Sequence, residues 1–233
     1  MPKNAIGNFT RTPIQGPLPY IDIKEIAEYR RELWNHELIG VLKKGQWTGY
    51  DYGNISFRMP MSSQEQKGVF LSCSQTSSKP EISMHDFALV IDYDSDKFEI
   101  RYIGAESPSS ETPIHLSAYL ADENIGAVIH GHIVNENYAL DKNTPYFPPH
   151  VLDFFQKNKL PCTKLRSKTK ESGDEIFRIV KDMRYVHTKD IPVIGMPNHD
   201  GGFGLIILGK DFKEAYDKTL EFYGNLLKFG KQL

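Results

Sequence analysis

Apolar residues recur along the chain with two different periods, and this pattern predicts a succession of helices and strands. From Ile21 to near Gly45 they recur every three or four positions with charged residues between them, as on an amphipathic helix. Residues 212–229 carry apolar side chains on one broad face and predict a closing helix. Between these segments, alternating or continuous apolar stretches predict strands over residues 55–58, 69–72, 87–91, 98–103, 127–133, 191–194 and 204–208.

Further helices are expected in the second half of the chain. Thr112 precedes Pro113, so Thr112 is the predicted N-cap of a helix that runs to about Ala121. Residues 176–183 predict another helix, and residues 151–155 a short one within a polar, proline-interrupted stretch. Helices therefore precede, separate and follow hairpin-like strands without strict βαβ alternation. This order predicts an α/β layered domain with a mixed sheet.

Composition narrows the functional classes. The 233 residues contain 28 Lys and Arg against 30 Asp and Glu, a net charge of −2 that gives no global footprint for nucleic acid or an anionic membrane. No stretch approaches 18 apolar residues, so no transmembrane helix is expected. Two cysteines are too few for a disulfide framework, which favours a reducing, cytoplasmic location. Residues 1–19 contain four prolines and predict an extended N-terminal arm, followed by a single domain over residues 20–233.

Two histidines stand two positions apart on the strand predicted over residues 127–133. Side chains at this spacing point to the same face of a strand, so His130 and His132 can both reach one metal ion. A chain with eight histidines also produces such a pair by chance, so the pair alone does not establish a metal site.

A catalytic zinc ion needs a third protein ligand and an open position for water or substrate. His199 lies in a glycine-rich turn before the strand over residues 204–208, where backbones approach closely, and is the candidate third ligand. His36 and His85 have charged neighbours and are interpreted as surface residues.

Glu111 follows two serines at a predicted helix start, where free backbone N–H groups favour anions. It either complements the helix dipole or serves as a functional carboxylate beside an anion pocket formed by Ser109 and Ser110. Asn54 and Ser56 lie in the turn entering the first strand, and Ser72, Ser74 and Thr76 form a third hydroxyl-rich turn. Together these turns, before a His-x-His strand, predict a phosphate or polyol site.

The order of these motifs provides a second line of argument. They are Gly53-Asn54-Ile55-Ser56-Phe57-Arg58, Ser107-Pro108-Ser109-Ser110-Glu111, His115-x-x-x-Tyr119, Ala127-Val128-Ile129-His130-Gly131-His132, Asn198-His199 and Leu208-Gly209-Lys210-Asp211-Phe212-Lys213-Glu214-Ala215. The series spans roughly residues 25–228 and resembles the class II aldolase/adducin family, with its zinc-dependent fuculose-phosphate aldolases and ribulose-phosphate 4-epimerases.

This resemblance implies a three-layer α/β/α fold with a mixed, largely antiparallel sheet, and a homotetramer with sites at subunit boundaries. It implies His130, His132 and His199 as ligands of one Zn²⁺ or similar divalent ion, and Glu111 as the acid/base carboxylate. The implied residues for the phosphate end of a substrate are Asn54, Ser109 and Ser110, with Ser74 and Gln75 in the matching second turn.

Two departures from the family pattern affect this picture. Sugar-phosphate aldolases of the family usually carry a Thr/Ser-Gly pair where this chain has Ser74-Gln75, and a glutamine would crowd a backbone-built phosphate cradle. After His199 the family usually continues with glycine, whereas here Asp200 intervenes before Gly201.

The resemblance predicts an aldolase-type lyase that cleaves or forms a carbon–carbon bond in a small sugar or sugar-phosphate carbonyl substrate through a metal-stabilised enediolate. The alternatives are a sugar-phosphate 4-epimerase, although those enzymes tend to carry Asp at the position of Glu111, a ketose-phosphate dehydratase, or a non-catalytic adducin-like interaction module. An unrelated zinc hydrolase is disfavoured because the chain has no His-Glu-x-x-His motif.

Residues 157–170 include six lysine or arginine side chains. They are either a solvated loop or an anion-steering strip near the site. Aromatic residues do not interleave with them, which argues against nucleic-acid binding.

Overall fold

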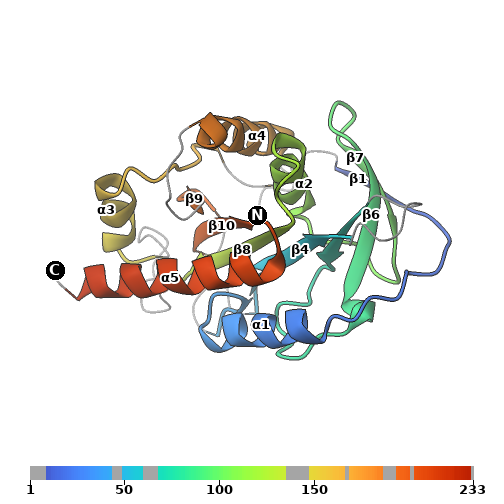
Figure 1. Cartoon of the computed structure of the whole chain (residues 1–233), viewed down its shortest axis with the longest axis horizontal. Helices are drawn as coiled ribbons and strands as arrows, with labels where there is room; N and C mark the ends of the chain where they lie inside the picture. The colour runs from blue at the N-terminus through green and yellow to red at the C-terminus, as the bar shows by residue number, and fades with distance from the viewer. Residues whose placement is uncertain are drawn as a thin grey trace.

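The fold is organised around one mixed sheet. A computed structural model of the chain describes residues 9–43, 49–59, 68–134, 147–165, 168–185, 193–199 and 202–231. Within these ranges eight strands form a sheet of order β1-β7-β6-β5-β4-β8-β10-β9 (Figure 1). The first pair, β1 and β7, is parallel and all other neighbours are antiparallel. The strands are β1 (Thr10–Pro13), β4 (Asn54–Arg58), β5 (Val69–Ser72), β6 (Phe87–Asp94), β7 (Glu99–Ile103), β8 (Ala127–Ile133), β9 (Val193–Met196) and β10 (Phe203–Gly209).

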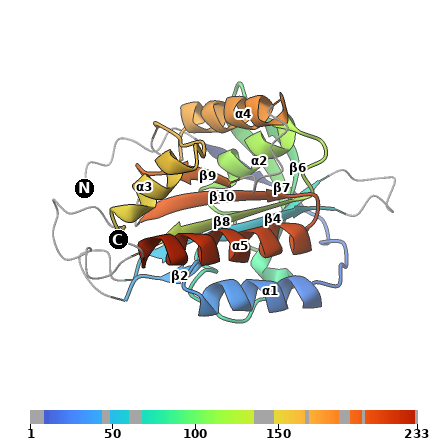
Figure 2. The same cartoon turned by 60° about the vertical axis from the view of Figure 1, so that its left-hand side comes forward.

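Helices cover both faces of this sheet, giving three layers (Figure 2). One core cluster packs one face of the sheet against α1, α3 and α5, and a second packs the opposite face against α2 and α4. The helices are α1 (Lys24–Asn35), α2 (Thr112–Ala121), α3 (His150–Lys157), α4 (Lys170–Tyr185) and α5 (Phe212–Gly230), with a short 3₁₀ helix, η1, over Met84–Asp86. The predicted α/β fold with a mixed, largely antiparallel sheet is therefore confirmed.

The central strand β8 separates apolar from functional side chains. Its residues Ala127, Ile129 and Ile133 belong to the core beneath α1 and α5, whereas Val128 belongs to the core beneath α2 and α4. Because a strand alternates its faces, His130 and His132 share the second face with Val128. Asn54 on β4 lies opposite His130, so the start of β4 brings its side chain to the same place.

The first helix is shorter than its apolar pattern predicts. It ends at Asn35, and Glu37 adopts a left-handed conformation with φ of 56°. The apolar positions Leu38, Ile39 and Leu42 are buried, as in the prediction, but they pack from an extended segment. There β2 (Gly40–Val41) pairs with β3 (Asp51–Tyr52), so burial and not helical periodicity explains the apolar residues after 36.

Other boundaries shift by smaller amounts. Thr112 is the first residue of α2, so the N-cap is Glu111 and not Thr112 as predicted. Helix α4 begins six residues earlier than predicted and β9 ends two residues later, while positions 191–192 lie outside the described residues. The described part of the predicted N-terminal arm is extended and adds β1 to the edge of the sheet. In the described part of the chain, none of the helices is both long enough and apolar enough to cross a membrane.

Gly53 offers a test of how the start of β4 is built. Its φ is +77°, and a Cβ there would lie 2.8 Å from Ile39 Cγ1 and 3.0 Å from the His130 carbonyl oxygen. Gly53→Ala is therefore expected to lower the free energy of unfolding in urea by at least ~1–2 kcal/mol, the ordinary cost of left-handed backbone in a non-glycine residue. In contrast, Gly224→Ala in α5, where a Cβ meets no atom within 4 Å, should raise it by about 0.5–1 kcal/mol. Equal stability of Gly53→Ala and the wild type would contradict this account.

Candidate functional site

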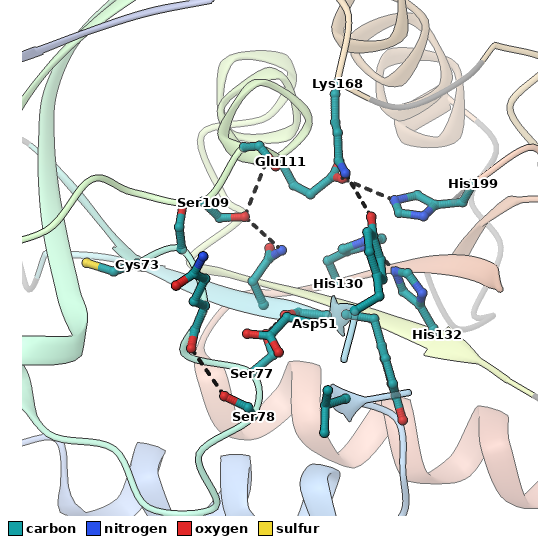
Figure 3. Close-up of a pocket in the computed structure, with 18 of the residues that line it drawn as sticks. Asp51, Cys73, Ser77, Ser78, Ser109, Glu111, His130, His132, Lys168 and His199 are labelled. Atoms are coloured by element: carbon teal, nitrogen blue, oxygen red, sulfur yellow. Dashed lines mark hydrogen bonds and ion pairs between the residues drawn. The ribbon is translucent and has the colours of Figure 1, made fainter. Parts of the chain in front are cut away.

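A cavity of about 590 Å³ opens where β3, β4 and β8 meet the turns that follow β5 and β7 and precede α4 (Figure 3). Nine of the predicted site residues line it, although they come from distant parts of the chain, whereas Ser56, Ser72 and Thr76 of the hydroxyl-rich turns are buried and do not. The nine are Asn54, Ser74, Gln75, Ser109, Ser110, Glu111, His130, His132 and His199.

Three buried imidazoles converge on one side of the cavity. His130 and His132 come from β8, and His199 from the turn between β9 and β10. The Nε2 atoms of His130 and His132 are 3.1 Å apart, and one ring nitrogen of each of the three histidines lies within 4.8 Å of the others. Gly204, opposite His132 across the strand pair, makes room for His199, since a Cβ there would lie 2.9 Å from the His199 ring.

The surroundings of His130 suit a metal ligand. His130 Nδ1 donates to the Leu205 carbonyl oxygen at 2.9 Å, which leaves the lone pair of Nε2 facing the cluster. Burial, reinforced by His199, lowers the pKa of His130 to about 3, so its imidazole is neutral at pH 7. Three imidazoles at this spacing, with a cavity on the remaining side, match the three-ligand zinc sites that keep one position open. The residues present therefore fit a zinc ion.

Glu111 lies beside the histidines at the start of α2. Its Oε1 is 3.3 Å from His199 Nε2 and 3.6 Å from Lys168 Nζ, and its side chain is 5% exposed. Burial alone raises the pKa of a carboxyl, but His199, His130 and Lys168 outweigh burial and lower the pKa of Glu111 to about 2. The carboxylate is therefore ionised over the whole physiological pH range.

Two residues that sequence reasoning did not single out complete this side of the site. Lys168, with φ of 69°, directs its ammonium group to Glu111 and donates a hydrogen bond of 2.8 Å to the Tyr50 hydroxyl. Tyr50 reaches this point from the segment before β3. The cationic stretch 157–170 signalled a basic contribution without identifying Lys168, because nothing in the spacing shows which lysine turns inward.

The remaining cations of that stretch differ from Lys168. Lys164 is exposed and Lys170 pairs with Asp174 at 3.2 Å, whereas Arg166 lies outside the described residues. The stretch is therefore not a uniform strip over the site.

The hydroxyl-rich turns form a polar recess on the other side of the cavity. The turns over residues 73–78 and 107–111 are joined by Ser74 N donating to Ser107 O at 3.0 Å and Ser109 N donating to Ser72 O at 3.1 Å. Ser109 Oγ accepts from Asn54 Nδ2 at 3.1 Å and from the Glu111 backbone N–H at 3.2 Å. Both acceptor positions of this hydroxyl are therefore used, and its proton is available to a ligand.

A buried network supports the site from behind. Ser56 Oγ lies 2.7 Å from His115 Nδ1 and 2.8 Å from the Tyr119 hydroxyl. Burial, with a contribution from His130, lowers the pKa of His115 to about 3 and keeps this ring neutral. In contrast, His36 and His85 are exposed, as predicted.

Comparison with known proteins relates most of the chain to one family. Residues 37–223 match the family described as class II aldolase and adducin N-terminal domain. A curated L-fuculose phosphate aldolase of Methanococcus maripaludis (strain C5 / ATCC BAA-1333) is 31% identical over 118 residues, which are 48% of this chain. The match covers only 55% of that relative's length.

Solved structures agree with the fold. A sugar-phosphate aldolase from Thermotoga maritima superposes with a TM-score of 0.58 at 17% identity, covering 90% of this chain and 93% of its own. A structure of L-fuculose 1-phosphate aldolase gives a TM-score of 0.59 at 17% identity, covering 92% and 88%. At these identities the likeness concerns the fold.

The histidine cluster predicts a measurable metal content. Protein prepared without a polyhistidine tag should bind about one zinc ion per chain, and His132→Ala should lose it because two imidazoles do not complete the site. His36→Ala removes an exposed histidine and should leave the metal content unchanged. Elemental analysis of dialysed protein makes the comparison, and retention of zinc by a folded His132→Ala variant would overturn the assignment.

Proposed function

Because the chain belongs to the class II aldolase and adducin family, we propose that it is a zinc-dependent aldolase-type lyase. Its substrate is a small sugar or sugar phosphate with a carbonyl group, in which it cleaves or forms a carbon–carbon bond. The observation that carries this proposal is the convergence of three buried imidazoles and one buried carboxylate on the same cavity. By family resemblance we also propose a cytoplasmic homotetramer with one zinc ion per subunit.

The reaction needs a Lewis acid at the substrate carbonyl and a base at the carbon next to it. Zinc held by His130, His132 and His199 would supply the Lewis acidity that polarises a substrate carbonyl and stabilises the enediolate. Glu111 Oε1, 3.3 Å from His199, stands beside the ligand set and is ionised, so it accepts the proton at the carbon next to the carbonyl and later returns it.

Other residues bind and orient the substrate. The Lys168 ammonium group lies against one side of the Glu111 carboxylate. This contact fixes the direction from which the carboxylate can reach the substrate. The polar recess contributes the hydroxyl of Ser109 and the side chains of Asn54, Ser74, Gln75 and Ser110 for the end of the substrate that lies away from the histidines. The histidines and Glu111 are all present, and a non-catalytic interaction module has no need of this complete set.

The first prediction from this mechanism concerns Glu111. Glu111→Gln removes the proton acceptor while keeping nearly the same volume, so turnover should fall by ~10²–10⁴-fold. Zinc content should remain that of the wild type. Glu123→Gln, an exposed residue in the turn after α2, is the matched control and should retain full activity. A panel of aldol cleavage, 4-epimerisation and dehydration assays supplies the substrates; unchanged turnover by Glu111→Gln in the active assay would exclude Glu111 as the base.

The second prediction concerns Lys168. Lys168→Met removes the cation 3.6 Å from Glu111, so kcat should fall about tenfold because the carboxylate is no longer held in place. Lys170→Met, two residues away and paired with Asp174, should leave kcat and KM unchanged. Steady-state kinetics separates the two parameters, and equal kinetics for both variants would show that Lys168 does not position Glu111.

A further inference from the structure

The polar recess contains a negative charge of its own. Asp51, on β3, lines the cavity and lies with Ser77 and Ser78 in the view of the site (Figure 3). Its carboxylate accepts a hydrogen bond from the Ser78 backbone N–H. One backbone donor of the turn over residues 73–78 is therefore already used by an acidic side chain of the protein itself. Asp51 Oδ2 is buried and has no hydrogen-bond partner among the described residues, and burial raises the pKa of this carboxyl. A phosphate dianion placed in the recess would be repelled by it.

A buried cation offsets this charge only in part, because the pKa of Asp51 stays raised although the charge of Arg30 lowers it. Arg30 is 3% exposed and lies behind the turn over residues 73–78. Its Nη2 donates to the Thr76 carbonyl oxygen at 2.9 Å, and its Nη1 donates to the Lys79 carbonyl oxygen. Its guanidinium interacts with the carboxylates of Asp51 and Asp86. Arg30 is therefore balanced by acidic residues of the chain and serves the turn by holding its carbonyl groups.

The cation that does line the cavity is used elsewhere. Among the described lining residues other than histidines, Lys168 is the only one with a cationic side chain. Its ammonium group lies at Glu111 and Tyr50, on the histidine side. A phosphate monoester in the recess would therefore meet hydroxyls and amides without a dedicated cation from these residues.

Gln75 changes the shape of the recess as well. It adopts a left-handed conformation with φ of 63°, which glycine accepts without strain and glutamine does not. Strained residues of this kind persist where the surrounding structure holds them, often at ligand sites. Gln75 is exposed at the edge of the cavity that it lines, and its side chain adds an amide that both donates and accepts hydrogen bonds.

The recess also presents an acceptor where a phosphate would need a donor. Asn54 Nδ2 donates a hydrogen bond to Ser109 Oγ, and Asn54 Oδ1 has no hydrogen-bond partner among the described residues. A buried acceptor of this kind is satisfied by a ligand that carries O–H groups, whereas an ionised phosphate oxygen is itself an acceptor.

We infer that the polar recess of this chain selects an uncharged, hydroxyl-bearing substrate end over a phosphate monoester. Asp51 and Gln75 are the residues that determine this specificity. The inference rests on the proposed function and narrows its substrate class to non-phosphorylated polyhydroxy carbonyl compounds.

Titration calorimetry on the zinc-loaded full chain tests this inference with two probes that share a carbonyl and an adjacent hydroxyl group and differ in whether the second hydroxyl is phosphorylated, dihydroxyacetone and dihydroxyacetone phosphate. The wild type should bind the uncharged probe at least as tightly as the phosphate. Asp51→Asn keeps the acceptor for Ser78 and removes the charge, so it should tighten binding of the phosphate probe about tenfold and leave the uncharged probe unchanged. Gln75→Gly should act in the same direction and relieve the backbone strain. Asp96→Asn, an exposed acidic residue between β6 and β7, is the charge control and should change neither affinity.

The possible results separate the inference from the proposed function. A wild type that binds the phosphate probe more tightly than the uncharged probe overturns the inference and leaves the lyase intact. Unchanged phosphate affinity in both Asp51→Asn and Gln75→Gly also overturns it. If the zinc-loaded protein neither binds nor turns over any carbonyl compound, with or without phosphate, the proposed function itself fails, and the inference falls with it.

Discussion

Three imidazoles and a carboxylate are buried together in this protein, and the cost of burying them constrains the rest of the structure. Unpaired polar groups are expensive in an apolar interior, so His130, His132, His199 and Glu111 must satisfy one another, the backbone, or a bound ion. The fold provides for this by placing two histidines on the central strand, fixing His130 through the Leu205 carbonyl, and leaving out a side chain at Gly204. The family match and the cluster both support the proposed metal site, since a metal ion would accept the lone pairs of the buried imidazoles and would supply Lewis acidity.

Much of the fold was predictable because it depends on local alternation. The period of two on β8 placed His130 and His132 on one face, and continuous apolar stretches located most central strands. The first helix was predicted too long because Leu38, Ile39 and Leu42 are apolar for tertiary reasons. They are buried from an extended segment, and the left-handed Glu37 that ends the helical path has no sequence signal as strong as glycine.

The candidate site was predictable only where a motif or the family resemblance marked it. Most residues quoted for it gather around the same cavity, yet Tyr50 and Asp51 were not anticipated, and Lys168 was foreseen only as one of six cations in the stretch 157–170. Asp51 is one residue of a two-residue strand, and its approach to Ser78 depends on how two distant turns pack. Lys168 is one of several similar cations, and only the backbone at that residue determines which of them faces Glu111. Contacts of this kind come from tertiary packing and leave no periodic pattern in the sequence.

We propose that a metal ion held by the histidines and Glu111 together labilise a proton next to a substrate carbonyl. Hydrogen–deuterium exchange at that carbon, followed by NMR with the zinc-loaded protein and dihydroxyacetone or its phosphate in D₂O, tests this step itself. We expect exchange with the wild type, none after zinc is removed by a chelator, and none with zinc-loaded Glu111→Gln. Absence of exchange by the zinc-loaded wild type, or exchange at the wild-type rate by Glu111→Gln, would contradict it.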